Sequence, residues 1–339
     1  MHVRPTIRDV AAKAGVTDMT VSRVVNRSGP VSDAVRARVE RAIEELGYVP
    51  SRIARGLRSR RTHTLALIVS DITNPFFTTL ARGVEDAASD REHLVMVCNT
   101  DESEEEEIRY LEMLSGQNVD GVLLVPAKGA EQARALAKRR QLPLVILERR
   151  IPESEHSIVH CDTRAGARSM MQYLLGLGHR EIAILASPIG IATSDDRVQG
   201  ALEALEGSDA NATVFHELLS RDTAAKGVER CLGMVPRPTA IFALNNLLTI
   251  GALRALRMHG ARVPEDISLG GFDDLPEPLL ERPFLTVVAQ PAYEMGRAGV
   301  ELLIAEISKP TSAPTEIVLP LELVIRGSIG PPPNSAPEG

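Results

Sequence analysis

Thr6–Asn26 read TIRDVAAKAGVTDMTVSRVVN, a pattern that predicts two short helices joined by a tight turn. Ala11, Gly15 and Val21 have the spacing of a helix-turn-helix. In that motif a small residue lets the helices approach, a glycine turns the chain, and a buried β-branched side chain fixes the second helix. We therefore expect residues 6–26 to form a helix-turn-helix, although spacing alone is only moderately specific for this motif.

Caps and apolar stripes predict three short helices before residue 48. Thr6, Thr17 and Ser32 are the expected caps, and Gly15 and Gly47 are the expected stops. The side chains expected to face inward are Ile7, Val10, Ala11, Ala14, Val21, Val24, Val25, Val35, Val39, Ala42, Ile43 and Leu46. The next segment, YVPSRIARGLRSRRTH (48–63), carries five arginines. It is too short and too basic to form a hydrophobic core of its own, so we expect either a linker or a helix that forms only under certain conditions.

Charge is distributed unevenly along the 339 residues. The first 62 residues hold thirteen Lys/Arg against six Asp/Glu, whereas the whole chain has a net charge of −7. A basic head on an acidic body indicates that only the head contacts nucleic acid. Chance clustering of surface charge is the alternative reading of this feature alone.

Bulk composition indicates a soluble protein of the reducing cytoplasm. Apolar residues make up 44% and charged residues 24% of the chain, which is ordinary for globular domains. No apolar run approaches the roughly 20 residues that span a bilayer, and MHVRPTIRDV lacks the apolar core of a secretion signal. Cys98, Cys161 and Cys231 are odd in number and set in apolar stretches, so we expect buried free thiols.

From Leu65 onward, short apolar runs alternate with amphipathic segments. The runs are LALIVSD, LVMVCNT, DGVLLVP, LVILE, IAILAS, TAIFALN and ISLGGFDD. Buried strands alternating with helices favour parallel sheets covered on both faces, and more than 250 residues of this texture fit two similar α/β lobes. Ligands of such sheets bind beyond the carboxyl ends of the strands. That rule points to Asp71–Phe77, Glu148, the loop around residue 190, Asn245–Asn246 and Asp273–Asp274.

The motifs taken together resemble the lactose/galactose repressor family along nearly the whole chain, including NPFF, LGHREIAIL, RVPEDISLGGFDD and the segment around Gln290. The resemblance implies an all-α helix-turn-helix head and an α/β body of two doubly wound parallel-sheet lobes, as in periplasmic binding proteins. The expected divisions are a head at 1–48, a hinge helix or linker at 49–62, an effector-binding and dimerisation domain at 63–330, and a disordered tail at 331–339. Within the body, the N-lobe would take about 63–161 and 292–322, and the C-lobe about 162–291 and 323–330.

The family pattern assigns roles within the head. Base-reading positions fall on Asp18, Met19 and Arg23, and Arg23 can bind guanine O6 and N7 with two hydrogen bonds. Asp18 has two readings: a carboxylate that suits the start of a helix, or an acceptor for the cytosine amino group. The positions that would contact phosphates are Thr6, Thr20, Ser22, Asn26 and Arg36, although Thr20 and Ser22 can also be ordinary surface residues.

In the family, the basic segment after Pro50 is a hinge helix that orders on the operator. By that match Leu57 enters the minor groove with Ala54 beside it and Arg55 and Arg58 flanking. Packing of Leu57 onto the body is the alternative. Gly56 departs from common family members, and glycine costs a helix about 1 kcal/mol relative to alanine.

Nine positions match the family's effector site: Phe76, Phe77, Glu148, Thr193, Arg197, Asp222, Asn245, Asp273 and Gln290. A sugar has apolar faces and a hydroxyl rim, so it suits an aromatic platform with groups that donate and accept. Phe77 can instead be core, Asn245 a helix cap, and Asp273 a turn residue. Asp222 stands where many relatives have an aromatic side chain, which puts a second stacking face in doubt. Ile191 replaces an arginine of purine-sensing relatives.

The resemblance predicts a homodimeric transcription regulator, most simply a repressor of carbohydrate-utilisation genes, that binds a pseudo-palindromic operator and a small sugar-like effector. It implies no cofactor or metal and no enzymatic activity. If the protein is a regulator of another kind, the alternative is a global carbon-catabolite regulator of the same family with a phosphoprotein partner. A periplasmic-type sugar receptor or an enzyme is a more remote alternative. HSIVH (156–160) has zinc-helix spacing, but SIV reads as a strand, which would separate the two histidines by roughly 13 Å.

Overall fold

The computed structural model describes residues 5–26, 28–48, 61–127, 131–151, 154–216, 218–275, 283–309 and 313–333. The chain divides into two compact units, Met1–Thr62 and His63–Gly339. Within the described ranges, no helix is long and apolar enough to cross a membrane.

The first unit contains the three expected helices, α1 (Ile7–Ala14), α2 (Asp18–Val25) and α3 (Asp33–Leu46). Thr17 caps α2, since its side chain accepts a hydrogen bond from the amide of Thr20. Gly15 and Gly47 end α1 and α3 in the left-handed region, at φ 67° and 59°. Ser32 occupies the N-cap position of α3 as expected, although its side chain makes no capping hydrogen bond. The apolar stripes meet in one small core around Val10, Val21 and Val39.

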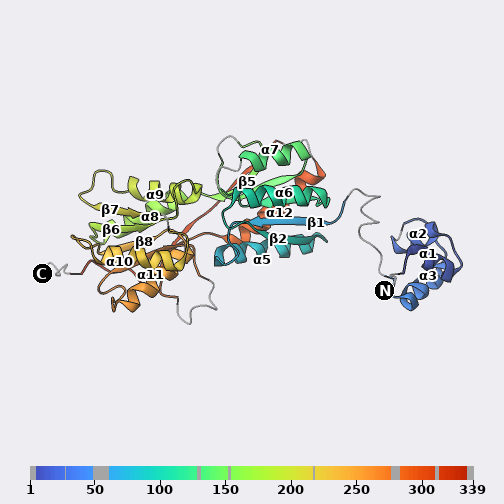
Figure 1. Ribbon diagram of the computed structural model, residues 1–339, viewed down its shortest axis with the longest axis horizontal. Coiled ribbons are helices and arrows are strands. Elements are labelled where there is room, and N and C mark those ends of the chain that lie inside the picture. Colours follow the sequence, from blue (N-terminus) through green and yellow to red (C-terminus); the bar gives the residue numbers. More distant parts are fainter. Residues whose placement is uncertain are drawn as a thin grey trace. The chain divides into compact units, whose positions relative to one another are not determined.

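The first sheet of the second unit, with its helices, is called the N-lobe. Its strand order is β11-β5-β4-β3-β1-β2, and all neighbours run parallel. The strands are β1 (Thr64–Val69), β2 (Leu94–Asn99), β3 (Gly121–Leu124), β4 (Leu144–Glu148), β5 (Ser157–Cys161) and β11 (Glu316–Leu319). One face is covered by α5 (Pro75–Asp90) and α12 (Ala292–Ser308), the other by α6 (Glu104–Gly116) and α7 (Glu131–Arg140) (Figure 1).

The second sheet, called the C-lobe with its helices, has the order β12-β10-β9-β8-β6-β7. Its strands are β6 (Glu181–Leu185), β7 (Asn211–Phe215), β8 (Ala240–Ala243), β9 (Ser268–Phe272), β10 (Thr286–Ala289) and β12 (Glu322–Val324), of which only β12 pairs antiparallel. One face packs against α8 (Thr163–Gly176) and α9 (Ala192–Glu203), the other against α10 (Arg221–Leu232) and α11 (Asn246–Met258). Both lobes are doubly wound, as expected.

Glycines set how closely the paired helices approach. A Cβ at Gly83 of α5 would lie 2.0 Å from the carbonyl oxygen of Tyr293 in α12, and one at Gly200 of α9 would lie 2.0 Å from that of Arg164 in α8. Neither position accepts a side chain, so backbone meets backbone at both crossings.

In the described part of the chain, three segments pass between the lobes: the step from β5 to α8, the step from β10 to α12, and Pro320–Leu321 between β11 and β12. Strands of both sheets end near these crossings. Side chains at their carboxyl ends can therefore meet across the lobe boundary.

The cysteine expectation holds for Cys161 and Cys231, which are buried free thiols, and burial raises the pKa of each to about 12. Cys98 is only partly buried because it lies on the edge strand β2.

Candidate functional site

The outer face of α2 carries the expected base-reading side chains. Asp18, Met19 and Arg23 are exposed, whereas Val21 and Val24 of the same helix are buried in the head's core. Arg23 Nη2 donates to the Met19 sulfur at 3.8 Å, which holds the two long side chains together. The helix therefore presents an acid, a thioether and a guanidinium on one exposed face.

Asp18 has a partner in the head itself. Its carboxylate lies 3.7 Å from Nε of Arg8, and both side chains are more than half exposed. An exposed pair of this kind contributes little to stability. Asp18 also occupies the first turn of α2, where a carboxylate suits the helix dipole. Both readings of Asp18 therefore remain open.

The candidates for phosphate contacts lie on several helices of the head. Asn26 Nδ2 donates to Ser22 Oγ at 3.2 Å, and Thr20 Oγ1 lies 3.0 Å from the capping oxygen of Thr17. Thr6 is exposed, and its amide donates to Asp9 at 2.7 Å. Arg36 is half-buried on α3. The hinge candidates Ala54, Arg55, Leu57 and Arg58 lie outside the described residues.

In the body, Glu148 ends β4 in an unusual backbone conformation. Its φ is 68°, a left-handed value that is uncommon for a side chain other than glycine. The carboxylate is buried, and Arg149 Nε donates to it at 3.3 Å. Arg149 also binds Glu102 and the carbonyl oxygen of Pro126, so it ties together the segments that follow β2, β3 and β4. Although burial opposes its charge, Glu102 and Glu148 hold the pKa of Arg149 above its usual value.

Arg197 connects the two lobes. It rises from α9 of the C-lobe, and Nη2 donates to Glu148 Oε1 of the N-lobe at 3.4 Å. Nη1 donates to the carbonyl oxygen of Leu244 at 2.7 Å, and the guanidinium lies 3.9 Å above the ring of Phe272. The side chains of Arg197 and Glu148 are only 5% and 6% exposed, so this ion pair is almost fully desolvated.

Asp273 completes this cluster at the end of β9. Its Oδ2 lies 3.9 Å from Arg197 Nη1, and its Oδ1 accepts from Gln290 Nε2 at 2.7 Å. Its φ of 69° is also left-handed. Burial raises the pKa of Asp273 to about 6, against the opposing effects of Arg197 and Gln290. We call Glu148, Arg197, Asp273 and Gln290 the cleft cluster.

A second polar network lies at the ends of β6 and β8. Asn245 Nδ2 donates to Ser187 Oγ at 3.3 Å, and the Ser187 amide donates to Ser194 Oγ at 3.1 Å. Asn245 also caps α11, so one of its alternative roles is confirmed. Thr193 is buried beside this network on α9.

The strand-end rule points to the loop around residue 190, but Thr193 and Arg197 lie in the helix that follows this loop. The chain turns at Gly190, with φ 98°, and α9 begins at Ala192, so both side chains project from the helix. A helical base holds a buried guanidinium more rigidly than a loop would.

The three remaining expected residues belong to α5 and α10. Phe76 and Phe77 begin α5, where Asn74 and Pro75 start the helix, and both rings pack in the N-lobe core at 5.1 Å from each other. The alternative reading of Phe77 as core is therefore confirmed. Asp222 is exposed on the first turn of α10.

Arg149, Phe272, Ser187 and Ser194 are not among the residues that the sequence predicts. Phe272 precedes Asp273 at the end of an apolar run, and Arg149 follows Glu148, so both adjoin expected residues. The rule that ligands lie beyond strand ends thus points to their neighbours but does not identify their contacts.

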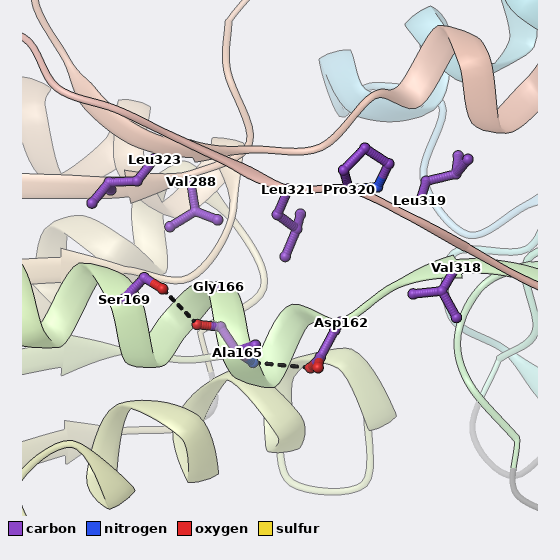
Figure 2. Close-up of a pocket in the computed structure, with 10 residues that line it drawn as sticks. All are labelled: Asp162, Ala165, Gly166, Ser169, Val288, Val318, Leu319, Pro320, Leu321 and Leu323. Atoms are coloured by element: carbon purple, nitrogen blue, oxygen red, sulfur yellow. Dashed lines mark hydrogen bonds between the residues drawn. The ribbon is translucent and has the colours of Figure 1, made fainter.

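A separate cavity of about 490 Å³ lies beside the Pro320–Leu321 crossing, and Figure 2 shows the residues that line it. It is lined mainly by apolar side chains of β10, β11 and β12, with Asp162 and Ser169 of the α8 region at its edge. None of the nine expected effector residues lines it.

Glu107 of α6 is another buried acid of the N-lobe. Its Oε2 accepts from the amide of Ala127 at 2.5 Å, just after β3. Burial raises the pKa of Glu107 to about 7, although the Ala127 amide and Arg149 lower it. The protonated form is thus favoured in the folded state.

Glu107→Gln is expected to stabilise the body more at pH 8 than at pH 5.5. In the wild type, the raised pKa of Glu107 means that its protonated carboxyl contributes to the stability of the folded state. This contribution is complete below the ordinary pKa of 4.5 and is lost as the pH rises through about 7. Between pH 5.5 and pH 8 the change in stability is about 2 kcal/mol, because part of the contribution is already lost at pH 5.5, and each kcal/mol changes Tm by roughly 2–4 °C. Thermal unfolding across this pH range measures it. Glu112→Gln, on the exposed face of α6, is the control; equal Tm differences for Glu107→Gln at both pH values would contradict the expectation.

Comparison with known proteins agrees with this architecture. Residues 6–51 match the model for bacterial regulatory proteins of the lacI family, and residues 171–329 match that for the periplasmic binding protein-like domain. The ribose operon repressor of Halalkalibacterium halodurans is 38% identical over 325 residues, covering 95% of this chain and 96% of the relative.

Two solved structures extend the likeness to the fold. A complex of the transcriptional regulator CelR with cellobiose has a TM-score of 0.71 and 37% identity, covering 96% of this chain and all of the other. The lac repressor dimer bound to operator and the anti-inducer ONPF has a TM-score of 0.85 and 26% identity, covering 96% of this chain and 99% of the other. These proteins share both the head and the two-lobed body with this chain.

Proposed function

The chain belongs to the lacI family of bacterial regulatory proteins, and from this premise we propose that it is a transcriptional repressor whose operator affinity is set by a small sugar-like effector. The relatives named above are regulators, and we propose no enzymatic activity for this chain. Such a protein works on the chromosome, so its proposed place is the cytoplasm, at the nucleoid.

The buried ion pair between Glu148 and Arg197 is the main support for the proposal that an effector controls this protein. It joins the N-lobe to the C-lobe, with Asp273 and Gln290 beside it. A ligand that enters this cluster changes the contacts across the lobe boundary. It can therefore favour one lobe arrangement over another, which is what allosteric control requires.

For the DNA half, we propose that Asp18, Met19 and Arg23 read bases. Their exposure on one face of α2 supports this assignment. Thr6, Thr20, Ser22, Asn26 and Arg36 would position the head on phosphates. We keep the hinge proposal for Ala54, Arg55, Leu57 and Arg58 on the family resemblance alone, and with it the proposed division into head (1–48), hinge (49–62) and body (63–330).

We also propose that Phe76, Phe77, Thr193, Asn245 and Asp222 belong to the effector site with the cleft cluster. Asn245 and Thr193 are supported by their place beside Arg197, at the end of β8 and in α9. The two phenylalanines and Asp222 rest on the resemblance.

The test of this function uses the full-length chain. A thermal-shift screen of sugars, sugar acids and nucleosides, ribose and cellobiose among them, should find a ligand that raises Tm as it occupies the site. That ligand should then change the affinity for the operator. If no compound of these classes changes either Tm or operator affinity, the effector proposal fails.

A homodimer is proposed because β2 is an exposed apolar edge strand of the N-lobe sheet. Leu94, Met96 and Val97 are 55%, 37% and 50% exposed on it. A long apolar edge promotes aggregation unless another chain covers it. Twofold pairing would also match a pseudo-palindromic operator.

Val97→Asp is expected to shift the protein from dimer to monomer, because a charge would be buried at the proposed interface. Analytical sedimentation measures the mass of the particle. The affinity for the operator should also fall, because a monomer can bind only one half-site. Val235→Asp, at a side chain 97% exposed in the C-lobe, should stay dimeric. A fully dimeric Val97→Asp protein would place the interface elsewhere.

A further inference from the structure

Carboxylates outnumber guanidinium groups where the N-lobe meets the cleft cluster. Arg149 donates to Glu102 at 2.8 Å and to Glu148 at 3.3 Å. Arg197 donates to Glu148 at 3.4 Å and lies 3.9 Å from Asp273. Three carboxylates therefore share two guanidinium groups, and neither arginine is left with an uncompensated charge.

No further buried cation balances this excess within the described residues, where Arg149 and Arg197 are the only buried Lys or Arg side chains. One further acid lies nearby. Asp196 precedes Arg197 on α9, is only partly exposed, and has Arg164 and Arg150 near it as well. An anionic ligand in the cleft cluster would thus meet an environment that is already negative.

Two atoms of the cluster have unmet hydrogen-bonding capacity. Arg197 Nε and Gln290 Oε1 are buried and have no hydrogen-bond partner among the described residues. Because the Asp273 carboxylate only accepts, Gln290 must turn its amide nitrogen toward it, which leaves the amide oxygen as a free acceptor. The site therefore offers one donor and one acceptor, both buried, next to paired charges.

A hydroxyl group satisfies either of these atoms, since it both donates and accepts. A phosphate or carboxylate group could accept from Arg197 Nε but could not donate to Gln290 Oε1. It would also lie close to Glu148 and Asp273, and like charges at short range oppose binding strongly.

We propose that the effector is an uncharged polyhydroxylated molecule, a neutral sugar or glycoside, and that Glu148 and Asp273 exclude the phosphorylated or carboxylated forms of the same sugar. This inference rests on the proposed effector function and specifies the charge of its ligand. It makes the two carboxylates determinants of specificity in addition to hydrogen-bonding groups.

The test is calorimetric titration of the full-length protein at pH 7.5 with matched pairs: ribose and ribose 5-phosphate, glucose and glucose 6-phosphate, glucose and glucuronate, and cellobiose as a larger neutral probe. For the pair whose neutral member binds, the anionic member should bind at least about 100-fold more weakly.

Two variants connect that difference to the proposed residues. Glu148→Gln and Asp273→Asn keep the size of each side chain and remove its charge. Each substitution should therefore reduce the ratio between the affinities for the neutral and the anionic ligand at least about tenfold. Glu85→Gln removes an acid on the exposed surface of α5, paired with Arg82, and should leave the difference unchanged.

The outcomes separate this inference from the proposed function. An anionic member that binds as tightly as its neutral partner, or a difference that neither variant changes, overturns the charge inference while the regulator still has an effector. Failure of every probe to bind or to change operator affinity removes the sugar-responsive function and this inference with it.

Discussion

Arg197→Ala is expected to abolish the response to effector while operator binding by the head persists. The substitution removes the ion pair with Glu148, the bond to the Leu244 carbonyl and the contact with Phe272. It also leaves Asp273 buried without a cation and Glu148 with Arg149 alone, and breaking a buried ion pair typically costs about 3–5 kcal/mol. Effector affinity should fall more than about 100-fold, as calorimetry would record.

Two companion variants make this result interpretable. Arg197→Lys keeps a buried positive charge but loses the planar guanidinium group with its fork of N–H donors. The variant should therefore fold, and its affinity for the effector should still fall at least about tenfold. Arg297→Ala removes a more exposed arginine of α12 that pairs with Asp90, and it should behave as wild type. A normal dose-response in the Arg197→Ala protein would contradict the site.

Arg23→Ala should weaken operator binding about 5- to 150-fold and relax the preference at one base pair. The reason is that a guanidinium on the exposed face of α2 can make two hydrogen bonds to guanine, worth about 1–3 kcal/mol. Affinity for a set of operators with single base-pair changes measures both effects.

Arg36→Ala is the matched comparison for Arg23. If Arg36 contacts a phosphate, its loss should weaken binding to all sequences evenly and reduce the salt dependence by about one phosphate contact. Even weakening by Arg23→Ala as well would remove Arg23 from the base-reading set.

The parts of the fold that follow from local chemistry could be predicted well. The cap at Thr17 and the stop at Gly47 depend on neighbouring residues only, and the structure confirms both. Central strands such as β4 are fully buried and read as unbroken apolar runs. The edge strands β7 and β12 escape this kind of prediction because they are partly exposed, so their sequences alternate or contain charge.

Site residues divide along a similar line. Glu148 ends a buried strand and Asp273 follows one, so the strand-end rule locates both from the sequence alone. The role of Arg149 depends on its hydrogen bond to Glu102, which lies 47 residues earlier in the chain, and no local sequence pattern predicts such a contact. The left-handed backbone at Glu148 is likewise a product of the assembled lobe rather than of its own sequence.

If one effector and one operator are coupled through the body, their binding must show reciprocal linkage. Operator affinity is measured with and without saturating effector, and effector affinity with and without operator. We predict that each ligand changes the affinity for the other by the same factor, about 5- to 150-fold. An operator affinity that is identical at zero and saturating effector would contradict the account.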